Sequence, residues 1–130
     1  MTTRQVVISE LQAFTERLVK RLALNVNAEL IEATPVLTGW AQANWVPNIG
    51  SPFEGTAGER PADQNTNPDR GPQSRGIASI ITYRLGPEIH QTNNVPYIEL
   101  LNAGSSSQAP AAFVQASILR AVRRTQTRTV

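Results

Sequence analysis

Cysteine is absent from this chain of 130 residues, and histidine and lysine occur once each, as His90 and Lys20. Without cysteine there is no disulfide framework, no thiol catalysis and no thiolate-bound metal, a composition that fits folding in the cytosol. A single histidine excludes multi-histidine metal sites and leaves a serine triad with one candidate base. No apolar run approaches the roughly 20 residues that cross a bilayer, so we expect no membrane partner.

The common catalytic motifs are also missing. There is no G-x-S-x-G elbow, and Ser105–Ser107 follow Gly104 in a run typical of a flexible turn. The phosphate-loop motif is absent, since Lys20 lies inside a helical pattern. We therefore predict no enzymatic activity, no catalytic residue and no cofactor.

One stretch resembles a metal-binding loop. Asp63 to Asp69 places oxygen-bearing side chains at alternating positions, as calcium loops do. The rest of that pattern fails, because Pro68 occupies the place of the turn glycine and Ser74 that of the bidentate glutamate. The sequence favours a solvated loop and no metal site.

The length fits one domain, residues 1–130. Residues 1–99 carry eight basic and ten acidic groups, a balance of −2, whereas residues 100–130 carry four arginines and no acid, a balance of +4. This basic end leaves open a small nucleic-acid-binding domain as an alternative function. Four charges without interleaved aromatic residues are equally typical of a solvated helix end.

A long amphipathic helix is predicted over about 9–33. Ser9 and Gln12 form a capping-box pattern at its start, and Pro35 disfavours the helical conformation at Thr34. Apolar residues recur every three or four positions along its inner face: Leu11, Phe14, Leu18, Leu22, Val26 and Leu30.

Residues 50–72 have a different composition. They include four glycines, four prolines and six charges, but no Val, Ile, Leu or Met. We predict a long loop that contributes nothing to the core, is mobile in the free subunit and orders against a neighbour. Phe53 is its one large apolar anchor, and Glu54, Glu59 and Asp63 are its candidate acidic contacts.

Shorter elements complete an α+β fold, in which the helices pack on a small, mainly antiparallel β-sheet. Strands are predicted at 45–49, where Pro47 implies an edge, and at 88–92. Helices are predicted at 73–85, at 96–101 and from Pro110 onward. The last should bury Val114, Ile118 and Val122, and the tail 125–130 should be frayed.

Trp40 and Trp45 are the largest apolar side chains, and both lie near proline-rich loops. Tryptophan is favoured at interface anchors, but two tryptophans in a small domain more often complete its core. We favour the core and keep both residues as interface candidates.

Two blocks resemble a known family. They are Thr34-Pro-Val-Leu-Thr-Gly39, and Asn93-Asn-Val-Pro-Tyr-Ile-Glu-Leu-Leu-Asn-Ala-Gly104 with the following Gln108-Ala-Pro-Ala-Ala-Phe-Val114. In this order, after an amphipathic helix, they resemble the tail-completion or minor tail component family of long-tailed bacteriophages, which includes lambda tail protein Z. The resemblance covers most of the chain outside 50–72.

The resemblance implies a structural virion protein at the head-proximal end of the tail or in the neck, which completes the tail and joins it to the head. It implies assembly in the bacterial cytoplasm as a hexameric ring, beside the tail tube or terminator protein and other neck proteins. A tail terminator or a head-completion stopper of the same connector stays open as an alternative.

The basic closing helix supplies the last interface candidates. Arg120, Arg123 and Arg124 should lie opposite its apolar arc and face a partner or solvent. We prefer contact with acids of a neighbouring subunit's loop, such as Glu59 or Asp63, over transient contact with passing genomic DNA, which tight phosphate pairing would hinder.

Overall fold

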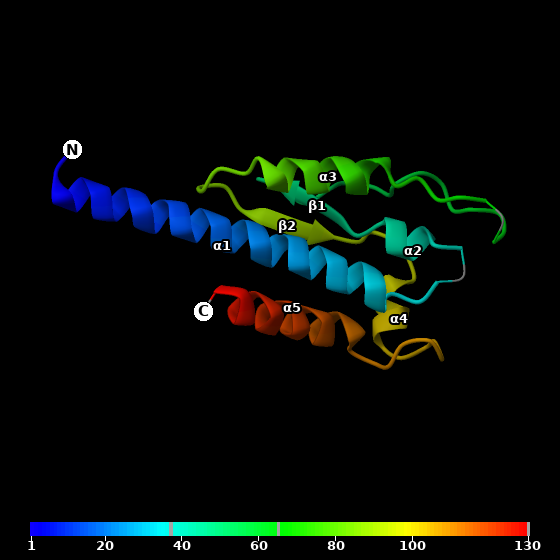
Figure 1. Ribbon diagram of the computed structural model, residues 1–130. Helices are drawn as coiled ribbons and strands as arrows, with labels where there is room; N and C mark the ends of the chain where they lie inside the picture. The colour runs from blue at the N-terminus through cyan, green and yellow to red at the C-terminus, as the bar shows by residue number, and fades with distance from the viewer. Residues whose placement is uncertain (37, 65, 130) are drawn as a thin grey trace.

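The computed structural model describes residues 1–36, 38–64 and 66–129, with backbone alone for 128 and 129. Leu37 of the first block, Asn65 of the calcium-like stretch and Val130 of the tail lie outside the described residues. The elements are, in chain order, α1 (Thr3–Ala33), α2 (Trp40–Ala43), β1 (Val46–Ile49), α3 (Gly71–Ile81), β2 (Ile89–Thr92), α4 (Ile98–Asn102) and α5 (Phe113–Thr129). Helix α1 runs between α5 on one side and the sheet with α3 on the other (Figure 1). The predicted α+β class is confirmed.

Helix α1 begins six residues earlier than predicted. Its capping box is formed by Thr2 and Gln5: the Gln5 N–H donates to Thr2 Oγ1 at 3.2 Å, and the Thr2 N–H donates to Gln5 Oε1 at 2.8 Å. Ser9 lies inside the helix, so the predicted capping box of Ser9 and Gln12 does not cap the helix. The helix ends before Pro35, as predicted, with Thr34 in an extended conformation.

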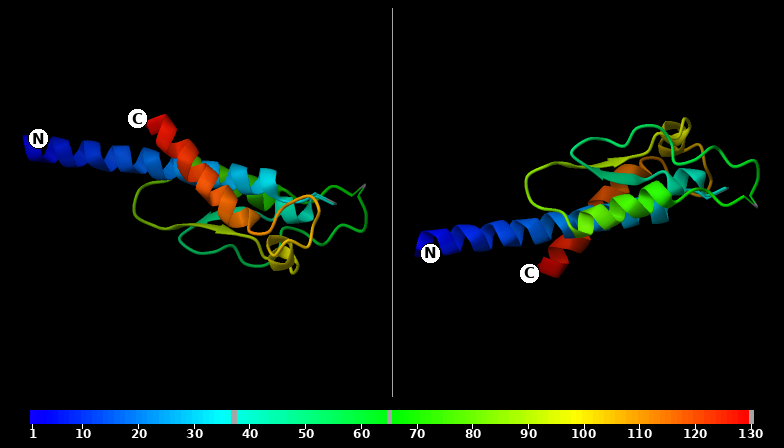
Figure 2. Two further views of the ribbon diagram at one scale, coloured as in Figure 1. Left: turned by 90° about the horizontal axis from the view of Figure 1, so that it is seen from below. Right: turned by 90° about the horizontal axis from the view of Figure 1, so that it is seen from above.

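The first half of α1 projects from the body. Residues 1–15 are all exposed, and both views of Figure 2 show this part of the helix extending beyond α5 and α3. The prediction that Leu11 and Phe14 face a core is therefore wrong, because no element of the described chain covers them.

The sheet consists of two antiparallel strands, with Pro47 opposite Gln91. Both strands were predicted, and Pro47 sits where it needs no second ladder partner. Helix α3 packs on β1 with Gly76 directly against Pro47. It begins at Gly71, with Pro72 in its first turn, and ends at Ile81, so the predicted end at Leu85 is wrong.

Amide side chains connect the layers of the core. Asn27 of α1 donates to the Trp45 carbonyl at 3.2 Å and to Gln91 Oε1 of β2 at 3.0 Å. Gln91 donates to the Ala23 carbonyl at 3.1 Å, and Gln73 of α3 donates to the Trp45 carbonyl at 3.1 Å. Among the described residues, every buried polar side-chain atom has a partner. These bonds join α1, α3, β2 and the residue that precedes β1.

Helix α5 differs from its prediction at both ends. It begins at Phe113, after Ala112 in a left-handed conformation, and not at Pro110. Its buried residues recur every four positions: Phe113, Ser117, Ala121 and Thr125. Ile118 is exposed, which corrects the predicted apolar arc. In the segment predicted to be frayed, the backbone is helical through Thr129 and Thr125 is buried.

Short helix α4 starts two residues after Pro96, close to its predicted position. The Ile98 N–H donates to the Val95 carbonyl at 3.1 Å, which closes the turn that contains the proline. Val95 is buried against Trp40 and Ala41. This contact holds α4 against α2.

Candidate interaction surfaces

The two sequence blocks meet at one cleft. It has a volume of about 410 Å³ and lies between the turn before α2, helix α4 and the loop that follows α4. Its lining residues include Thr38 and Gly39 from the first block, and Tyr97, Leu101 and Gln108 from the second. Blocks that are more than 50 positions apart in the sequence therefore form one surface.

A hydrogen bond connects the two blocks, and another connects the second block to helix α2. The Val36 N–H donates to Gln108 Oε1 at 2.9 Å, and Asn93 Nδ2 donates to the Ala41 carbonyl at 2.8 Å. Gly39 precedes α2 with φ +82°, a conformation that favours glycine. The geometry of the turn and these two long-range bonds fix the walls of the cleft.

An aromatic pair forms the floor of the cleft. The rings of Trp40 and Tyr97 lie 6.1 Å apart and tilted, and the Arg60 guanidinium lies 5.4 Å from the centre of the Tyr97 ring. Burial raises the pKa of the Tyr97 hydroxyl, and the nearby Arg60 charge opposes this rise. The cleft thus offers an apolar floor with one cationic rim, which suits packing against another protein surface.

Trp40 and Trp45 belong to the core. Each is 6% exposed, and each indole N–H donates inside the chain, from Trp40 to the Ala57 carbonyl at 3.3 Å and from Trp45 to Thr34 Oγ1 at 2.7 Å. The favoured core interpretation is confirmed. Neither residue is an exposed interface anchor, although Trp40 lines the cleft from beneath.

The first part of the loop 50–72 is fastened to the body. Asn94 Nδ2 donates to the carbonyls of Phe53 and Gly55, both at 2.8 Å, and the Ala57 N–H donates to Asn44 Oδ1 at 2.6 Å. Ala57 is 1% exposed, so the prediction that this loop adds nothing to the core is wrong. Phe53 is half-buried, whereas Glu54, Glu59 and Asp63 are exposed.

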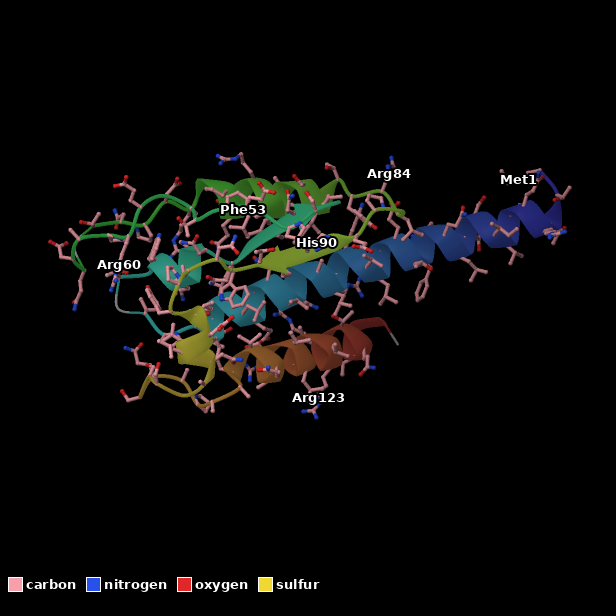
Figure 3. All side chains as sticks on the ribbon, turned by 180° about the vertical axis from the view of Figure 1, so that it is seen from behind. Met1, Phe53, Arg60, Arg84, His90 and Arg123 are labelled. Carbon is pink, nitrogen blue, oxygen red and sulfur yellow. The ribbon has the colours of Figure 1, made fainter. Side chains whose placement is uncertain are left out.

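Glu29 of α1 binds two of the three candidate arginines. Arg120 Nε lies 3.2 Å from Glu29 Oε2, and an Arg124 Nη lies 3.6 Å from Glu29 Oε1. The chain itself thus supplies an acid for Arg120 and Arg124, and their role in a partner interface stays a prediction. Arg123 is exposed and points away from the body in Figure 3.

The residues weighed for catalysis are dispersed. His90 on β2 pairs with Glu88 at 3.3 Å, whereas Ser105–Ser107 line the cleft, to which His90 does not contribute. Asp63 accepts a hydrogen bond from the Thr66 hydroxyl at 3.2 Å. Across residues 1–36, 38–64 and 66–129, no cluster of three His, Cys, Asp or Glu suits a metal, and no helix is long and apolar enough to span a membrane.

Glu16 marks the point where α1 enters the body. The Leu85 N–H donates to its carboxylate at 3.0 Å, and this bond, opposed by desolvation and helped by Lys20 and Arg84, lowers its pKa below the ordinary value of 4.5. A carboxylate whose pKa is lower in the folded than in the unfolded state stabilises the fold at pH values above its unfolded-state pKa. That contribution is lost as the pH falls below about 4.5 and through the folded value.

We expect Glu16→Gln to be less stable than the wild type at pH 7, and this difference to shrink as the pH falls below 4.5. Urea unfolding at pH 7 and at about pH 3 measures both differences. Glu10→Gln, an exposed acid on the projecting part of the same helix, is the matched control. A stability difference for Glu16→Gln that is equal at both pH values would contradict the assigned role.

Comparison of the chain with protein-family models, curated protein sequences and solved structures finds no match.

Proposed function

We propose that this protein is a structural assembly subunit rather than an enzyme, and specifically a ring-forming subunit of a long-tailed bacteriophage. In this role it completes the head-proximal end of the tail and joins the tail to the head. One observation carries the proposal: the two blocks that resemble the tail-completion family lie together around one cleft. A bond from Val36 to Gln108 joins them, and a bond from Asn93 to Ala41 joins the second block to α2.

The distribution of surface features suits contacts between unlike faces. The loop 50–72 carries four acids and two arginines, and the part of it that leads into α3 lies at the opposite end of the molecule from the start of α1 (Figure 1). Arg123 projects from a third place, on α5. Cyclic rings use two different faces of each subunit, so an elongated subunit with distinct ends fits this kind of assembly.

The alternatives differ in their support. A tail terminator or a head-completion stopper would use the same surfaces. The position of the protein in the particle distinguishes these roles from the joining role. A nucleic-acid-binding domain has less support, because Arg120 and Arg124 are engaged by Glu29 within the chain. Phosphate binding by these two arginines would have to break that arrangement.

The proposal is tested by particles assembled without this chain. In a lysate of a phage that encodes it, with its gene interrupted, we expect separate heads and tails by electron microscopy. Addition of the purified chain should restore joining, and labelled protein should lie at the joint. Free heads with complete, capped tails indicate the joining role, whereas tails of irregular length indicate a terminator.

The joining experiment has a control variant of the same chain. Ser9→Ala alters only an exposed hydroxyl on the projecting helix and should restore joining as well as the wild type. Normal numbers of infectious particles in the absence of the chain would contradict the proposed function.

A further inference from the structure

The projecting part of α1 carries an apolar groove that the rest of the described chain leaves uncovered. Val7, Leu11 and Phe14 are 51%, 60% and 46% exposed. Together with Glu10 and Arg17 they line a shallow groove of about 420 Å³. Apolar side chains of this size gathered on one face of a protruding helix indicate a contact surface.

The spacing of this apolar face is that of a coiled coil. Val7, Leu11, Phe14 and Leu18 are separated by four, three and four residues, which are the alternating d and a positions of a heptad. The same face continues one heptad beyond Leu18 at Asn25, which hydrogen-bonds Thr125 of α5 at 2.9 Å. Helix α5 thus covers this face within the body and ends before the projecting part (Figure 2).

We propose that the groove is occupied by the same segment of a second copy of this chain, with the two α1 helices antiparallel about a two-fold axis. In antiparallel coiled coils each a position lies opposite a d position. Leu11 of one copy then faces Phe14 of the other, and Val7 faces Leu18. Each of these contacts occurs twice, once in each direction between the copies, as an isologous interface requires.

The charges at the rim of the groove fit this occupant. Glu10 and Arg17 both hold g positions, one heptad apart. In an antiparallel pair the g positions of the two helices face each other, so Glu10 of each copy meets Arg17 of the other. The interface therefore gains two opposite-charge pairs. A parallel pair would place Glu10 beside Thr15 and would leave both charges without a partner across the interface.

The size of the contact sets its strength. The body already holds α1 helical, so pairing does not incur the cost of helix nucleation. The overlap from residue 7 to residue 18 is about 18 Å long, and one helix face of that length buries less than the roughly 800 Å² per partner of a standard interface. The free chain is thus in a concentration-dependent equilibrium between monomer and dimer.

This inference goes beyond the proposed function and does not depend on it. A two-fold contact between neighbours cannot repeat around a cyclic ring, because ring contacts join two different faces. The dimer contact is consequently distinct from the contacts within one ring. Joining of heads to tails and dimerisation of the purified chain are separate measurements.

Charge reversal tests both the occupant and the orientation. In sedimentation analysis of the purified full chain, the wild type should dimerise as its concentration rises. Glu10→Arg and Arg17→Glu, each alone, should weaken dimerisation about tenfold, because both charge pairs become repulsive. An equal mixture of the two variants should recover the affinity, since every pair then has opposite signs. The double variant E10R/R17E should recover it alone.

Position 9 provides the matched controls. Ser9 lies on the opposite side of the helix from Leu11 and is exposed, so Ser9→Arg and Ser9→Glu add either charge without touching the groove. Both should dimerise like the wild type. The proposal is overturned if the wild type stays monomeric at every concentration, or if the mixture of Glu10→Arg and Arg17→Glu associates no better than either variant alone.

Discussion

Replacement of Gly76 by alanine is expected to destabilise the fold by about 3 kcal/mol, although alanine is the better helix former by about 1 kcal/mol. A Cβ atom at this position would overlap the Pro47 carbonyl oxygen and approach two carbons of the proline ring to 2.9 Å. Since the obstacle is backbone, α3 must move away from β1. The expected loss is a large share of the 5–15 kcal/mol that stabilises a typical domain.

Thermal and urea unfolding of the Gly76→Ala protein measure this effect, and we expect its melting temperature to fall by about 10 °C. Ser74→Ala on the exposed side of α3 is the matched control, because it adds helix propensity without entering the contact with Pro47. Equal or higher stability of Gly76→Ala would show that α3 can shift on the sheet without loss.

Local signals in the sequence predict the elements of this fold well where a single residue determines the backbone. Pro35 ends α1 because it disfavours a helical conformation at Thr34, and both strands lie where the turn residues delimit them. The capping box failed because two such patterns occur seven residues apart, at Thr2 and Ser9. Nothing in the local pattern distinguishes the box that starts a helix from one inside it.

Burial was harder to predict, because periodicity indicates an apolar face but not what covers it. Phe14 and Leu30 lie on apolar positions of one helix, yet Phe14 is exposed and Leu30 is buried. The difference is that the remaining elements reach only the second half of α1. In α5, by contrast, the polar residues Ser117 and Thr125 are buried, because their hydroxyls donate to carbonyls one turn earlier.

The candidate surfaces depend on contacts distant in sequence. Tyr97 and Leu101 belong to the second block, but the cleft forms only when the turn before α2 lies beside them. Glu29 and Arg120 are 91 positions apart, so no local pattern links them. The interface role of the arginines was predicted from their helix face alone, which is why the acid on α1 was missed.

Replacement of the Asn27 amide by a carboxylate is expected to destabilise the fold strongly at neutral pH. Asn27 is 2% exposed and donates both of its side-chain N–H bonds to oxygen atoms, the Trp45 carbonyl and Gln91 Oε1. In Asn27→Asp the ionised side chain has no donor and faces two acceptors in a buried place. We expect a loss of about 4 kcal/mol at pH 7.

The pH dependence of this loss has a definite sign. Burial beside acceptors raises the pKa of the introduced carboxyl in the folded state above its unfolded value of about 4. Below that pH the acid is protonated in both states and can donate one hydrogen bond, so the variant is closest to the wild type there. The loss grows as the pH rises above about 4 and stops growing above the raised folded value.

Urea unfolding from pH 3 to pH 8 measures this dependence, with Gln12→Glu as a control that adds an acid at an exposed position of α1. The control should show no comparable loss at any pH. Since Glu16 contributes stability that disappears on acidification, the wild type should weaken toward low pH while Asn27→Asp approaches it. A loss in Asn27→Asp that is independent of pH would mean that water reaches this position. The amide network between α1, α3 and the sheet would then not be the dry junction that its hydrogen bonds describe.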